Sequence, residues 1–171
     1  MATTIPVPVE FELPDGWTPA PPDEVGAPGA AFVALRPPAE NGFTANITIS
    51  GDYPAAEATL EVIADESVQR LEQSSEQVTV TNRTEVGTAE APGLTQLVRM
   101  RPIVEGSALD LVQSQVYISL LDVDNPQQRF VLQLVLTATP GQLDGVIDDF
   151  QQFVSTVRPK NADTGSEEGE G

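Results

Sequence analysis

Residues 130–157 constrain the fold more than any other part of the chain. In an extended chain the side chains alternate between two faces, so the segment 130–136 predicts a strand with one fully apolar face, made of Phe130, Leu132, Leu134 and Leu136. The segment 143–157 then places apolar residues at helical spacing. An apolar strand face followed by an apolar helix stripe predicts a helix packed on a sheet, and we expect this unit to nucleate a domain.

The remaining segments predict a chain built mostly of strands. Alternating apolar and polar residues predict strands at 7–13, 31–35, 45–50, 77–83, 94–101 and 109–120. Helical spacing predicts one further helix at 59–74, and the proline-rich segment 18–29 predicts an irregular surface loop. The expected fold class is α+β, with a twisted antiparallel sheet of about seven strands, two helices packed on it, and the order β-β-β-α-β-β-β-β-α. We expect an interior that includes Phe11, Ile47, Leu71, Val98, Val116, Leu132, Leu134, Ile147, Phe150 and Val157.

The start of the last helix is marked unusually clearly. Thr139 can accept hydrogen bonds from the first free backbone N–H groups, and Gln142 stands three residues later, which completes a capping box. Pro140 occupies the first helical position, where its missing N–H does no harm. We therefore expect the helix to begin directly after Thr139.

The chain length predicts one domain and a tail. A chain of 171 residues can bury a sizeable core, and we expect a single domain over residues 1–159. Residues 160–171 are small, polar and acidic, so we expect a disordered tail there.

The composition removes most catalytic mechanisms. The chain has no Cys and no His, so it lacks thiolate chemistry and the usual base of a nucleophilic serine. Its only lysine, Lys160, lies in the tail. Asp144 and Asp148 are one helical turn apart, but on the polar side of the last helix, which is typical of a solvated face. We therefore expect a non-catalytic protein without a cofactor.

The net charge of −18 restricts the partners. Nucleic acid and anionic membrane surfaces would be repelled, so we expect neither as a partner. No run of 18 apolar residues is present, and the first residues do not read as an export signal, so we expect a cytoplasmic protein without a membrane span; a secreted mature form is the alternative.

One short acidic segment was considered as a metal site. Asp122, Asp124 and Asn125 place oxygen ligands near one another, as in a calcium-binding loop. The glycine and the bidentate glutamate of such a loop are missing, because Gln127 and Gln128 follow instead. We interpret the segment as an ordinary turn between strands and expect no metal site.

The best candidate for a partner surface is the second face of the central strands. In the predicted strands 109–120 and 130–136, residues Leu111, Tyr117, Val131, Gln133 and Val135 lie on the face opposite the apolar one. A mixed apolar and polar surface of this kind can accept a partner segment. We therefore expect this surface to be exposed and to bind a protein.

Three of the eight basic residues follow strand alternation as well. Arg83, Arg99 and Arg101 are expected on the polar face of two adjacent strands. Either they form salt bridges with acids such as Glu85 and Glu105, or they form a positive stripe that a carboxylate-bearing partner recognises. Salt bridges are the simpler interpretation, because exposed ion pairs are frequent.

The element order and two short motifs resemble a known family. The first motif is Phe11-Glu-Leu-Pro-Asp-Gly-Trp17, and the second runs from Phe150 through Phe153 to Val157-Arg158 at the end of the last helix. Together they resemble the actinobacterial LpqN-type proteins, which share the fold of PsbP and of the Ran-binding Mog proteins, over roughly residues 5–159. The resemblance implies that the protein binds other molecules and does not catalyse, as a protein-binding adaptor or a secretion-associated chaperone. A carrier of an apolar small molecule is the alternative, and the oligomeric state stays open.

Overall fold

The computed structural model describes residues 9–21, 31–40, 42–53, 58–87, 92–104, 106–121 and 129–159. Its elements in chain order are β1 (Val9–Glu10), β2 (Thr18–Ala20), β3 (Phe32–Glu40), β4 (Phe43–Asp52), α1 (Leu60–Ser74), β5 (Ser75–Gly87), β6 (Pro92–Val104), β7 (Ser107–Ala108), β8 (Leu111–Leu121), β9 (Arg129–Ala138), α2 (Pro140–Thr156) and β10 (Arg158–Pro159). The predicted α+β class is confirmed. The segment 122–128, which contains the acidic turn, and the tail from residue 160 lie outside the described residues.

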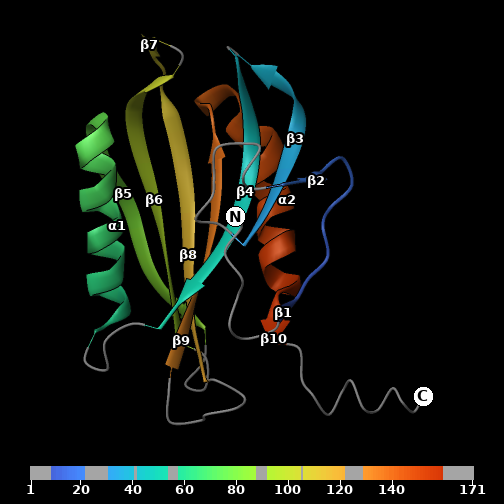
Figure 1. The fold of residues 1–171 in the computed structure, drawn as a ribbon, viewed down its shortest axis with the longest axis vertical. Helices are drawn as coiled ribbons and strands as arrows, with labels where there is room; N and C mark the ends of the chain where they lie inside the picture. Colours follow the sequence, from blue (N-terminus) through green and yellow to red (C-terminus); the bar gives the residue numbers. More distant parts are fainter. Residues whose placement is uncertain are drawn as a thin grey trace.

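The main sheet is antiparallel, and its strands run in the order β2-β3-β4-β9-β8-β6-β5. The short strand β7 forms a hairpin with the end of β6, while β1 and β10 form a separate two-stranded pair. Figure 1 shows α1 beside β5 and β6 at one side of the sheet, and α2 at the other side, near β3 and β4. The strand β9 is central, as its apolar pattern predicts.

The two helices pack on opposite faces of the sheet. Alternate residues of β9 show this, because Leu132 and Leu134 belong to the core beneath α2, whereas Val131 belongs to the cluster beneath α1. The helix α2 contacts β4, β9 and β8, and α1 contacts β5, β6 and β8. Each helix therefore covers only some strands of its own face, and among the described residues no helix contacts the remaining strands of that face at three or more positions.

The beginning of α2 is confirmed in detail. Thr139 Oγ1 accepts a hydrogen bond from the Gln142 N–H at 3.1 Å, and Gln142 Oε1 accepts one from the Thr139 N–H at 3.0 Å. The Thr139 hydroxyl also donates to the carboxylate of Glu40, at the end of β3. The free N–H groups and positive dipole of this helix end therefore already have partners within the protein.

The expected first strand was wrong in extent and in pairing. Within the described part of 7–13, only β1 is a strand, and it pairs with β10 instead of joining the main sheet. The edge of the main sheet is β2, which lies in the segment predicted to be an irregular loop. The turn at Pro14 explains the difference, because the Trp17 N–H donates to the Pro14 carbonyl at 3.4 Å and brings residues 18–20 alongside β3.

The expected interior is confirmed for its central members. Ile47, Val98, Val116, Leu132, Leu134 and Phe150 are buried. Phe11, Leu71, Ile147 and Val157 are only half-buried, because they lie at the margins of the two helix–sheet contacts. In the ranges described, neither helix combines the length and the apolar character needed to cross a bilayer.

Candidate functional site

The structure places on two faces of the sheet the three arginines that strand alternation predicts on one face. Between Val80 and Asn82 the register of β5 against β6 shifts by one residue, so Arg83 pairs opposite Gln96, on the face beneath α1. Arg99 and Arg101 of β6 lie on the opposite face. The prediction that all three share one face was therefore wrong, because one extra residue in a strand moves every later side chain to the other face.

Two of the arginines form salt bridges, as the simpler interpretation predicted, but with other acids. Arg83 pairs with Asp65 of α1 at 2.9 Å, and Arg101 pairs with Asp110 at 3.3 Å. Arg99 is exposed, and no acid of the described residues pairs with it. Among the described residues, Arg99 is therefore a positively charged side chain without an ion-pair partner.

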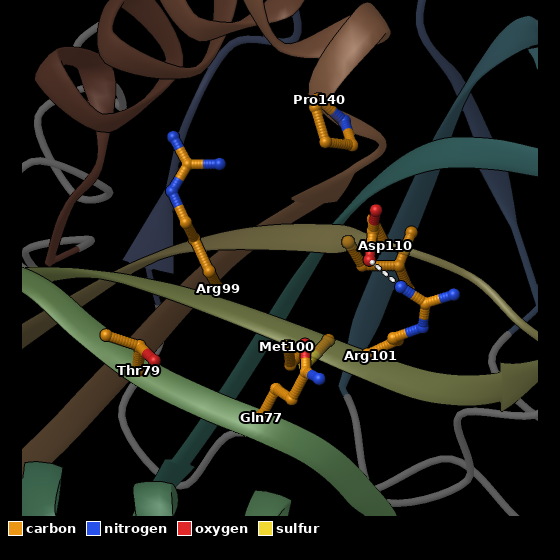
Figure 2. Close-up of a pocket in the computed structure, with 8 residues that line it drawn as sticks. Gln77, Thr79, Arg99, Met100, Arg101, Asp110 and Pro140 are labelled. Carbon is orange, nitrogen blue, oxygen red and sulfur yellow. Dashed lines mark hydrogen bonds and ion pairs between the residues drawn. The ribbon is translucent and has the colours of Figure 1, made fainter.

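Arg99 and Arg101 line a shallow pocket of about 300 Å³ on the part of the sheet that α2 leaves uncovered. Figure 2 shows both side chains rising from β6, with Pro140 of α2 above the opening and the β5 residues below it. The remaining lining is mixed in character and comprises Gln77, Thr79, Met100, Asp110, Leu111 and Pro140. The pocket therefore joins two elements far apart in the sequence, the β5–β6 hairpin and the start of α2.

The chemistry of this pocket suits a carboxylate with a short apolar portion. A guanidinium presents several N–H donors in a planar fork, which matches the two oxygens of a carboxylate. Gln77 and Thr79 add polar side chains beside it, and Met100, Leu111 and Pro140 add apolar surface. Asp110 holds Arg101 by its ion pair, so Arg99 is the cation free to take up a ligand.

The expected exposed surface on the central strands is not found. Tyr117, Leu111 and Val131 do lie on one face, but Tyr117 is 0% exposed, Val131 6% and Leu111 4%. Helix α1 covers Tyr117 and Val131 together with Leu94, and Ala64 of the helix packs against them. Gln133 and Val135 are half-buried. The expectation was wrong about exposure because the strand pattern shows which residues share a face but not which helix lies over it.

A polar network lies beneath α1 where an apolar layer is more usual. Gln96 and Gln115 are each 2% exposed, and Gln96 Nε2 donates to Gln115 Oε1 at 2.7 Å. The Tyr117 hydroxyl donates to the same oxygen at 2.7 Å, and Arg83 Nε donates to Gln96 Oε1 at 2.9 Å. Gln133 Nε2 reaches both the Tyr117 hydroxyl and Ser67 of α1. Two glutamines in succession on one face of β8, Gln113 and Gln115, are the sequence signal of this network.

Burial determines the protonation of Tyr117. Desolvation raises the pKa of its hydroxyl above the ordinary value of 10.0, and the Ser67 side chain, Arg70, Gln96 and Arg83 oppose that shift. The phenol therefore stays neutral near pH 7 and serves as a hydrogen-bond donor. It offers neither a base nor a nucleophile under those conditions.

Metal ligands do not gather in the part of the chain that the structure describes, where no three acidic side chains are grouped to hold an ion. Asp144 and Asp148 are exposed, as expected for the polar side of α2. Asp149, their neighbour, is instead bonded to Trp17 and Arg36.

The described residues define a class of architecture, an antiparallel sheet of seven strands besides the short β7, with one helix on each face. No family model matches the sequence, and no curated protein matches it. Solved structures match the fold. LpqN of Mycobacterium tuberculosis, described as involved in cell envelope biogenesis, superposes with a TM-score of 0.62 at 12% identity, covering 90% of this chain and 83% of that one.

Two further structures extend this likeness. The yeast Ran-binding protein Mog1p gives a TM-score of 0.57 at 12% identity and covers 91% of this chain and 92% of its own. The cyanobacterial PsbP of Synechocystis gives 0.53 at 14% identity, with 89% and 86% covered. The resemblance expected from the two motifs is confirmed at the level of the fold: the chain has the fold shared by PsbP and Mog1p and resembles LpqN.

Proposed function

We propose that this protein is a non-catalytic binding module that docks a protein partner on the part of the sheet formed by β5 and β6, where Arg99 takes up a carboxylate of that partner. The observation that carries the proposal is Arg99 itself, an exposed guanidinium beside a pocket of about 300 Å³ with no counter-charge among the described residues. Arg70 and Arg129 are also exposed without an ion pair among the described residues, but Arg99 is the one of the three that lines the pocket.

The shared fold supports a binding role. Mog1p is described as a Ran-binding protein, and LpqN as involved in cell envelope biogenesis. The composition supports it as well, because a chain without His or Cys has few groups for acid–base or covalent catalysis. A partner whose Asp, Glu or terminal carboxylate enters the pocket meets one free arginine and the polar side chains of Gln77 and Thr79.

An adaptor fits the structure better than a chaperone for apolar segments. Such a chaperone needs an exposed apolar face, and α1 covers the face that was expected to supply it. A carrier of an apolar molecule needs an internal cavity. The core beneath α2 is instead filled by large side chains, and a Cβ atom placed on Gly51 would lie 2.1 Å from the Phe130 ring.

The test is capture of partners from the native host, followed by an affinity measurement with the purified partner. Arg99→Ala should weaken binding about tenfold to a hundredfold, since a hydrogen bond to a charged group is worth ~1.5–3 kcal/mol. Arg99→Lys should recover only part of the loss, because an ammonium cannot form the bidentate fork.

Arg129→Ala is the matched control, since Arg129 is an exposed arginine at the start of β9, outside the pocket. Equal affinity of the wild type and Arg99→Ala for the partner would contradict the proposal that Arg99 binds a carboxylate of the partner in this pocket. Co-purification of a lipid in place of any stoichiometric protein would favour the carrier.

A further inference from the structure

The outer side of β5 is a long free strand edge. In the strand order β5 ends the main sheet, and among the described residues no strand pairs with its outer side. It spans 13 residues, whereas β2 at the opposite edge spans 3. All its side chains are exposed except those of Ser75, Val78 and Arg83. A free edge of this length presents unpaired N–H and C=O groups that can pair with another extended chain.

The second half of β5 is the part suited to pairing. Register shifts interrupt the strand between Glu76 and Thr79 and between Val80 and Asn82. From residue 82 to residue 87 the pairing with β6 is regular. A bulge twists an edge away from a partner, so the regular segment 82–87 is where an added strand fits.

Helix α1 forms an acidic wall along this edge. Asp65 reaches Arg83 of β5 at 2.9 Å, so the side of α1 that carries Asp65 faces the strand. Glu61 stands four residues before Asp65, on that same side, and Glu85 of β5 is on the α1 face as well, because it pairs opposite Leu94; both are exposed. On the other face of the sheet the strand presents Val86, which is 43% exposed and pairs opposite Gly93. At residues 82–87 the α1 face therefore carries two acids, besides Arg83 in its ion pair with Asp65, and the other face carries Val86 beside Asn82 and Thr84.

We propose that the outer edge of β5, at residues 82–87, accepts an extended segment of a partner protein with Lys or Arg at alternate positions. The basic side chains lie on the α1 face, near Glu61 and Glu85, and the intervening apolar side chains lie on the face of Val86. Main-chain hydrogen bonds supply the pairing, and the charges select the sequence. This surface is distinct from the Arg99 pocket and selects the opposite charge. A second copy of the chain is disfavoured as occupant, because it would bring its own Glu61 and Glu85 to the same edge.

The first experiment uses three capped heptapeptides and hydrogen exchange measured by NMR. The probe is Lys-Val-Lys-Val-Lys-Val-Lys; one twin replaces each Lys by Glu, and another is N-methylated at alternate backbone positions. The Lys peptide should slow exchange of the outward amides in 82–87. The N-methylated twin should bind about tenfold more weakly, because it keeps the charge but loses main-chain hydrogen bonds. Equal binding by the Lys and N-methylated peptides, or by the Lys and Glu peptides, would overturn the proposal.

The second experiment uses protein variants. Glu61→Gln with Glu85→Gln should weaken binding of the Lys peptide about twofold to tenfold, as expected for two exposed ion pairs. Asp144→Asn with Asp148→Asn, which removes two exposed acids of α2, should leave binding unchanged. Arg99→Ala should also leave it unchanged, so failure of the proposed pocket and failure of this edge are distinguishable.

Proline substitutions test the edge directly. The N–H groups of neighbouring strand residues point to opposite sides of the strand, so one of the Thr84 and Glu85 N–H groups points to β6 and the other points outward. Proline lacks this N–H. One of Thr84→Pro and Glu85→Pro therefore breaks a hydrogen bond to β6, and the other removes only a donor of the outer edge. The variant that keeps the wild-type unfolding midpoint should lose the peptide, and retained binding by that variant contradicts the proposal. If both variants unfold, the N-methylated peptide decides. A dimer seen by sedimentation without peptide, together with slow hydrogen exchange at residues 82–87, would also overturn the proposal.

Discussion

Three side chains connect the first turn of the chain to its last helix. Trp17 is 7% exposed, and its Nε1 donates to Asp149 Oδ2 at 3.0 Å. Arg36 of β3 donates to the same oxygen at 3.1 Å. Gly16 adopts a φ of +92°, and a Cβ atom there would lie 2.9 Å from Arg36 Nε, so glycine is required on both grounds. The Pro-Asp-Gly-Trp motif thus has a structural role, which is to anchor the edge of the sheet to α2.

Loss of the Asp149 carboxylate should destabilise the fold. In Asp149→Ala the buried indole N–H of Trp17 loses its acceptor and Arg36 loses its ion pair, so the free energy of unfolding should fall by ~1–3 kcal/mol. Urea titration measures the change in the free energy of unfolding. Asp148→Ala, at the exposed neighbouring position, should change the free energy of unfolding by less than ~0.5 kcal/mol. Equal effects of the two substitutions would contradict the anchoring role.

Tyr117 should give the stability a dependence on alkaline pH. Burial raises the pKa of the folded-state phenol above 10.0, so the unfolded chain releases this proton at a lower pH than the folded protein does. The contribution to stability is therefore complete below about pH 10 and is lost as the pH rises through the folded-state pKa. Urea titrations from pH 8 upward should show a steeper decline for the wild type than for Tyr117→Phe. Parallel curves would show that Tyr117 makes no such contribution.

At the scale of elements, the two helices are held to the sheet by different kinds of contact. Helix α2 buries Val146, Phe150 and Phe153 against the strands. Helix α1 buries only Ala64 and Ser67, and it is supported by a hydrogen-bonded network of glutamines and Tyr117. Apolar burial provides most of the free energy that fixes a helix on a sheet, so α2 should contribute more to global stability than α1.

Truncation of the central aromatic side chain of α2 measures that contribution. Phe150 is 1% exposed, so Phe150→Ala should lower the free energy of unfolding by ~3–5 kcal/mol through lost burial and the cavity left behind. Gln151→Ala, at the exposed next position, is the control. A loss below ~1 kcal/mol in a denaturant titration would contradict the assignment of this helix face to the core.

At the scale of the whole molecule, the net charge of −18 opposes compaction. Like charges repel more strongly in the folded state, where they are closer together, and dissolved salt screens that repulsion. The unfolding temperature at pH 7 should therefore rise as sodium chloride is raised from low to physiological concentration. The rise should shrink near the isoelectric point of about 4.1, where the repulsion disappears. An equal rise in unfolding temperature at both pH values would contradict screening of charge repulsion as the cause.

The candidate site was predictable only in part. The sequence directed attention to Arg99 and Arg101, and both line the pocket. It did not place Pro140 beside them, because the start of α2 and β6 come together only in the folded protein. Arg83 was assigned to the wrong face because a single extra residue in β5 leaves no mark in the alternation of a polar strand.

Local pattern determined the central strand and the last helix of this protein. The alternation in 130–136 and the Thr139-Pro140 start of α2 depend on neighbouring residues, because strand faces and helix caps are local properties, and the structure confirms both. Only the tertiary structure decided what covers each face. Tyr117 lies beneath α1, β2 forms the sheet edge, and Arg99 stays outside the cover of α2. Those outcomes depend on how residues far apart in the chain pack, and no local spacing encodes that.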